Sequence, residues 1–160
     1  MPTARSTTSK CLFTAWVLAW ATAVYLPSFV IALLSLSPLD ASGNLFWDTF
    51  QVADEVSPAA KLTYGFLFGA FVMSARGGGT RYGLSGNILI GMISIALVVA
   101  LLPEYWSRGF GIGLNGMRFD PLPTAIYLIG GFTSGVIFTL TEAKCGSRSQ
   151  ERAPHQSHDD

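Results

Sequence analysis

The part of the sequence that most resembles a chemical site is a short basic run rich in glycine, Arg76-Gly77-Gly78-Gly79-Thr80-Arg81. Its composition resembles a phosphate-binding loop, in which glycines let backbone N–H groups approach phosphate oxygens. It lacks the Lys-Ser or Lys-Thr ending and the preceding soluble strand that a nucleotide loop needs. We therefore do not expect nucleotide binding. Arg76 and Arg81 are instead candidates for binding anionic lipid headgroups, or for a plain topology signal.

Titratable side chains are scarce in the apolar parts of the chain. Lys61 and Glu142 lie only at the edges of apolar runs, and the Lys61 ammonium can extend outward to the membrane surface. The two histidines, His155 and His158, lie in a polar tail, and neither HExxH nor GxSxG occurs in the sequence. We therefore predict no catalytic residue, no metal ligand and no bound cofactor, and we do not expect an enzyme.

The composition is typical of a membrane protein. Half of the 160 residues are apolar and 12% are charged, which is about half the charged share of an ordinary soluble domain. Acids and bases cancel to a formal net charge of zero, so we expect no nucleic-acid partner.

Four apolar runs predict the fold. Each is long enough to cross a hydrocarbon core of about 30 Å as a helix. The first run resembles a signal peptide at its start, but it continues well past the length of a signal core. We therefore predict an all-α integral membrane protein, a bundle of four transmembrane helices within residues 11–142. The predicted spans are residues 11–36, 58–75, 83–102 and 121–141.

Prolines mark expected helix starts and one expected kink. Ser57-Pro58 and Asp120-Pro121 each combine an N-cap residue with proline at the first helical position. Pro27 falls inside the first span, where it removes a backbone donor and predicts a kink.

Between the spans we expect two external loops. Residues 39–57 contain an amphipathic stretch, 45–50, that predicts a short helix on the membrane surface. Trp47 and Phe50 would anchor it, although a loop that docks a partner is the alternative. Residues 109–117 are rich in glycine, and they form either a flexible external loop or a segment that dips back into the membrane.

The distribution of basic residues predicts the orientation, because Lys and Arg are enriched in cytoplasmic loops. With four spans, both termini lie on the side of the basic run. We therefore predict that both termini are cytoplasmic, with residues 1–10 an N-terminal segment and 143–160 a disordered tail. Cys11 and Cys145 would then face the cytoplasm, where a disulfide is not expected. Seven basic residues are expected on the cytoplasmic side and three on the outside. The seven are Arg5, Lys10, Arg76, Arg81, Lys144, Arg148 and Arg152.

Two pairs of glycines predict helix packing. Gly65 and Gly69 lie four residues apart, as do Gly131 and Gly135. Each pair shares one helix face, and small residues there let two membrane helices approach closely.

These features favour a non-catalytic accessory, assembly or interaction component of a membrane complex. The alternative is a small transporter or channel for a neutral or small solute that acts as an oligomer. In either case the partners would be the lipid bilayer and either further copies of the chain or other membrane subunits. We expect a multi-pass protein of the bacterial inner (plasma) membrane.

Overall fold

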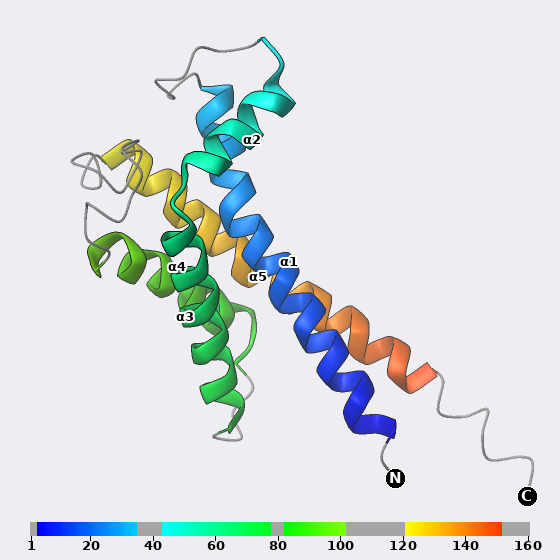
Figure 1. The fold of residues 1–160 in the computed structure, drawn as a ribbon. Coiled ribbons are helices and arrows are strands. Elements are labelled where there is room, and N and C mark those ends of the chain that lie inside the picture. The colour runs from blue at the N-terminus through cyan, green and yellow to red at the C-terminus, as the bar shows by residue number, and fades with distance from the viewer. Residues whose placement is uncertain (1–2, 35–42, 78–81, 102–120, 152–160) are drawn as a thin grey trace, which may run out of the picture.

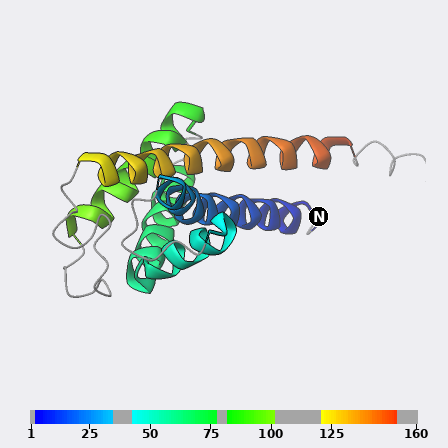
Figure 2. The same cartoon turned by 90° about the horizontal axis from the view of Figure 1, so that it is seen from above.

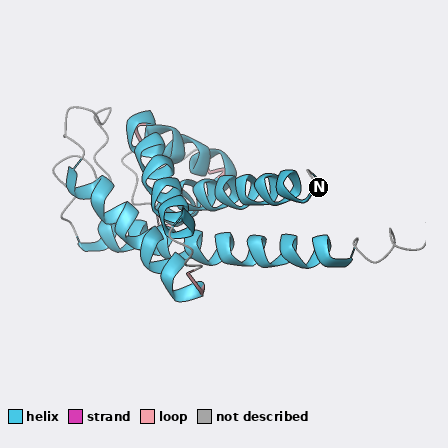
Figure 3. Ribbon diagram, turned by 90° about the horizontal axis from the view of Figure 1, so that it is seen from below, coloured by secondary structure: helices cyan, strands magenta, loops and turns pink. Residues whose placement is uncertain are grey.

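The structure, a computed structural model, describes residues 3–34, 43–77, 82–101 and 121–151. These segments form five helices and no strand, which confirms the predicted all-α class (Figures 1 and 3). The helices are α1 (Thr3–Leu33), α2 (Leu45–Glu55), α3 (Pro58–Gly77), α4 (Leu84–Leu101) and α5 (Pro121–Glu151).

The helices α1 and α5 form the most extensive contact in the described structure. They run antiparallel, and their terminal ends extend together beyond α3 and α4 (Figures 1 and 2). The buried alanines of α1, Ala15, Ala19 and Ala23, recur every four residues and therefore share one face. A Cβ atom at Gly130 would lie 2.5 Å from the ring of Pro27, so this contact requires glycine. The helix α1 continues on both sides of Pro27.

The helix α4 crosses α5 at glycines. A Cβ atom at Gly91 would lie 2.2 Å from the backbone oxygen of Gly131, and one at Gly135 would lie 2.4 Å from that of Asn87. Both distances are far below van der Waals contact, so the two backbones touch only because these side chains are missing.

The helix α3 packs against α1 through two stacked indole rings, Trp16 and Trp20, whose centroids lie 5.8 Å apart. The Trp16 N–H donates to the backbone oxygen of Gly65 at 3.0 Å, and the Trp20 N–H donates to that of Lys61 at 2.8 Å. A Cβ atom at Gly69 would lie 2.9 Å from the indole nitrogen of Trp16. The missing side chains on this face of α3 make room for the indole rings.

Three described segments are long and apolar enough to cross a membrane: Ser9–Leu33, Leu84–Leu101 and Thr124–Cys145. A fourth crossing is reached only if α2 and α3 count as one broken span, with its halves bent by 81°. Residues 45–50, predicted as a short helix on the membrane surface, are helical within the longer α2, but α2 packs on α1 and is part of this broken unit.

Two helices extend beyond their predicted ends. The helix α1 begins at Thr3 rather than at residue 11, and α5 continues to Glu151 rather than ending near residue 141. The polar tail expected from residue 143 is thus helical through Glu151. Extending an existing helix costs little, and this stretch contains no proline. The remaining tail, 152–160, lies outside the described residues.

Candidate functional site

The break between α2 and α3 is the most distinctive feature of the described structure. The helix α2 ends at Glu55 and α3 begins at Pro58. The buried Ser57 hydroxyl accepts a hydrogen bond from the Ala60 N–H at 3.1 Å, which confirms the predicted Ser-Pro helix start. This cap fixes the first turn of α3 and thereby the position of Lys61.

A cavity of about 640 Å³ lies between α1, α2 and the first turn of α3. This volume falls within the range of small-molecule sites. The walls are mainly apolar and aromatic, with an amide and two opposite charges among them. The lining residues are Val17, Trp20, Ala21, Val24, Tyr25, Trp47, Phe50, Gln51, Ala53, Asp54 and Lys61.

The contacts of α3 set the level of Lys61 along the neighbouring helices. The sequence predicts Lys61 at the edge of a span, with its charge directed to the membrane surface. In the structure its backbone oxygen accepts the N–H of Trp20, which lies near the middle of the apolar segment Ser9–Leu33. One helical turn later, Tyr64 bonds to Ser134, near the middle of Thr124–Cys145. Two independent contacts therefore place the start of α3 level with the centres of the neighbouring apolar segments.

The two charges in the cavity lie on opposite sides of the break. Asp54 is in the last turn of α2 and is exposed, whereas Lys61 is in the first turn of α3 and is half-buried. They interact electrostatically, but among the described side chains they do not form an ion pair.

Each of these charged residues also lies at the helix end whose partial charge has the same sign as its own. A helix carries partial negative charge at its C-terminus and partial positive charge at its N-terminus. Asp54 at the end of α2 and Lys61 at the start of α3 are both placed against this preference. Helix stability does not account for either charge, whereas a site with one negative and one positive end does.

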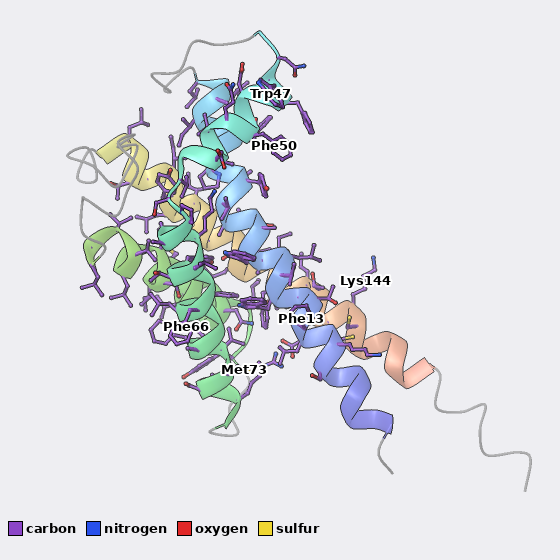
Figure 4. All side chains as sticks on the ribbon, in the orientation of Figure 1. Phe13, Trp47, Phe50, Phe66, Met73 and Lys144 are labelled. Carbon is purple, nitrogen blue, oxygen red and sulfur yellow. The ribbon has the colours of Figure 1, made fainter. Side chains whose placement is uncertain are left out.

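Aromatic rings form much of the remaining wall. Tyr25 of α1 and Phe50 of α2 meet edge to face, with ring centroids 5.5 Å apart. Trp47 and Phe50 project from α2 toward the same side (Figure 4). Aromatic faces attract cations, as the carboxylate of Asp54 does. This side of the cavity therefore favours a positively charged group.

The predicted packing glycines all lie in contacts within the chain. Gly65 and Gly69 face the indoles of α1, whereas Gly131 and Gly135 face the backbone of α4. Gly131 and Gly135 are therefore not available to a second protein without rearrangement, whereas Gly65 and Gly69 also line a groove between α1 and α3.

The predicted lipid-binding arginine Arg76 is engaged within the chain. Its guanidinium pairs with Glu142 at 2.5 Å and lies 5.5 Å from the ring centroid of Phe138. Both side chains of the pair keep partial contact with solvent. The second candidate, Arg81, and the glycine-rich loop 109–117 lie outside the described residues.

The sequence did not predict two hydrogen-bonded chains of polar side chains at the helix crossings. Tyr64 donates to Ser134, which donates to the Gly131 oxygen at 2.8 Å. Asn87 donates to Thr139 at 2.9 Å, and Thr139 donates to the oxygen of Gly135 at 2.9 Å. The buried amide of Asn87 in an otherwise apolar run was the available signal. These chains satisfy buried polar groups and join α3 and α4 to α5.

The two cysteines, 134 positions apart in the sequence, meet in the structure. Cys11 on α1 and Cys145 on α5 are free thiols that lie close enough to interact with each other. Cys11 lies in the N-terminal part of α1 and Cys145 in the C-terminal part of α5. These two helix ends lie side by side in Figure 1. Within the described segments, no group of three or more His, Cys, Asp or Glu side chains gathers as metal ligands would.

Comparison with known protein families, with curated proteins and with solved structures finds no match for this chain.

Proposed function

We propose that this chain is a multi-pass membrane protein of the bacterial inner membrane that carries a small solute through the cavity at the α2–α3 break, acting as an oligomer. One observation supports this most strongly. Two charged residues, Asp54 and Lys61, line one cavity, and Lys61 lies level with the centre of the apolar segment Ser9–Leu33. Charged residues at such depth are costly, and in membrane proteins they mark solute and ion pathways.

The broken helix supports the same proposal. Transporters place their binding sites near the bilayer midplane, often where a helix is discontinuous. Nonhelical backbone at that depth is tolerated where it is buried in protein or lines a water-filled cavity. In the proposed topology α2 and α3 together form the second of four crossings, with both termini cytoplasmic. Four helices enclose little space, so neighbouring copies would complete the pathway.

Accessibility of the cavity to water tests this proposal. The background is Cys11→Ser with Cys145→Ser, and Ala21→Cys places one thiol in the cavity wall. We expect the membrane-impermeant cation MTSET to label this thiol from either side in oriented vesicles. The matched control is Leu18→Cys, which lies on the same helix outside the cavity and is 45% exposed. It should react only with a membrane-permeant maleimide. If Ala21→Cys also reacts only with the maleimide, the cavity is filled with lipid and is no pathway.

The second candidate function is an accessory or assembly component. A groove of about 390 Å³ between α1 and α3 favours it, because its apolar wall is open to a partner helix. Phe13, Phe66 and Met73 line this groove and are exposed (Figure 4). Purification in mild detergent with mass spectrometry tests this candidate. The accessory function requires that a second membrane protein co-purifies with the wild type and is lost from the Phe66→Ala variant. Retention with both forms would argue against the groove.

A further inference from the structure

We infer that the cavity at the α2–α3 break selects a small zwitterion with an apolar body, such as an amino acid with a large apolar side chain or a betaine. This inference rests on the proposed function and specifies the class of solute. The cavity presents one negative and one positive group, with apolar and aromatic side chains lining the rest of it.

The negative end combines Asp54 with the C-terminal end of α2. The exposed carboxylate and the partial negative charge of the helix end both attract a cation. Tyr25, Trp47 and Phe50 line the same cavity, and aromatic faces add attraction for an ammonium group. This end therefore fits a primary or quaternary ammonium.

The positive end combines Lys61 with the N-terminal end of α3. The ammonium of Lys61 and the partial positive charge of the helix start both attract an anion. Because Ser57 fixes this turn and Trp20 holds the backbone of Lys61, the positive end has a fixed place in the cavity. It fits a carboxylate or a comparable small anion.

The apolar wall beside the two charges defines the remaining part of the solute. Val17, Ala21 and Val24 of α1 are apolar and line the cavity. A solute with one charge matches only one of these two groups, and a charge without a counterion is unfavourable at the half-buried Lys61. A zwitterion matches both charges at once.

Protection of the Ala21→Cys thiol from MTSET tests the inference on the full chain in vesicles. The probes are L-phenylalanine, 2-phenylethylamine, which lacks the carboxylate, and 3-phenylpropanoate, which lacks the ammonium. We expect L-phenylalanine to protect at concentrations about ten- to a hundredfold lower than either analogue, the effect of losing one hydrogen bond to a charged group. Equal protection by either analogue would overturn the inference.

Charge variants make the test specific. In Asp54→Asn, 3-phenylpropanoate should protect as well as L-phenylalanine, and in Lys61→Met the same should hold for 2-phenylethylamine. Asp48→Asn is the matched control, since Asp48 lies on α2 but does not line the cavity, and it should keep the wild-type order. Glycine betaine replaces L-phenylalanine in a parallel series, with choline as its analogue without the carboxylate. Labelling without protection by either zwitterion overturns the solute class but leaves the pathway standing. No labelling at all refutes both.

Discussion

The hydroxyl of Tyr64 on α3 bonds to the hydroxyl of Ser134 on α5, although 70 positions separate the two residues. Both side chains are buried, and Ser134 passes the bond on to a backbone oxygen of its own helix. This contact joins α3, the most loosely packed of the apolar helices, to the α1–α5 pair.

The Tyr64–Ser134 bond should contribute measurably to stability. Tyr64→Phe removes the hydroxyl and keeps the ring, so the free energy of unfolding should fall by about 0.6 kcal/mol, as for other hydrogen bonds between membrane helices. A double-mutant cycle with Ser134→Ala, followed by unfolding in detergent, measures the coupling. Tyr82→Phe is the control, because the Tyr82 side chain is largely exposed. Additive effects of the two changes would mean that the bond contributes nothing.

The α4–α5 crossing should not tolerate a methyl group. Gly91→Ala directs a Cβ atom toward the Gly131 oxygen, and overpacking of this kind costs about 1–3 kcal/mol. Thermal unfolding in detergent should show a lower midpoint with normal membrane insertion. Gly83→Ala is the matched control, because nothing lies within 4 Å of its added Cβ atom. Equal midpoints for both variants would place α4 and α5 further apart than described.

The indole hydrogen bond that positions Lys61 should also be measurable. Trp20→Phe keeps an aromatic ring but removes the N–H, so stability should fall by about 1 kcal/mol, a typical net value for one hydrogen bond. Denaturant titration checks this value. Trp47→Phe, at a ring that is more than half exposed, should change stability less. A larger loss at Trp47 would show that the indole of Trp20 is not what holds α3 to α1.

The contact between the cysteines predicts an efficient cross-link. Copper phenanthroline in detergent should oxidise Cys11 and Cys145 to a disulfide within one chain, because thiols in contact need little movement to reach bonding geometry. Intact mass spectrometry would detect the loss of two hydrogen atoms, and Cys11→Ser should abolish it. Dimers linked between chains, without the internal disulfide, would contradict the antiparallel pairing of α1 and α5.

Reporter fusions test the proposed topology. Fusions at Ser9, Gly78 and Ser149 should report the cytoplasm, because basic residues cluster near these positions. Fusions at Ser42 and Asn115 should report the outside. A cytoplasmic signal at Asn115 would exclude a topology with four crossings. A cytoplasmic signal at Ser42 would exclude the first crossing, which α1 forms.

The sequence predicted the helices well because their signals are local. Long apolar runs define α1, α4 and α5, and proline at the first helical position begins both α3 and α5. The glycine pairs also predicted close packing, but they did not predict which group packs against the glycine face of each helix. Whether an indole ring or a neighbouring backbone occupies that space depends on how the helices pair in three dimensions.

The candidate site could not be predicted, because its position depends on the relative depth of two helices. The order of residues along the chain places Lys61 near the end of an apolar run. Its depth follows only from the hydrogen bond between Trp20 and Lys61. Likewise, the amphipathic pattern of α2 fits a membrane surface as well as the side of α1, where the buried Val52 and Ala53 belong to its packed face.

The most extensive contact in the described structure, between α1 and α5, joins a helix that ends at Leu33 to one that begins only at Pro121. Helices enter the membrane in the order of translation. The face of α1 that carries Ala23 and Pro27 must therefore remain in lipid, or against a component of the insertion machinery, until the ribosome has completed α5. A chain that stops after α4 leaves this face uncovered, so the assembly of α1 into the bundle depends on α5.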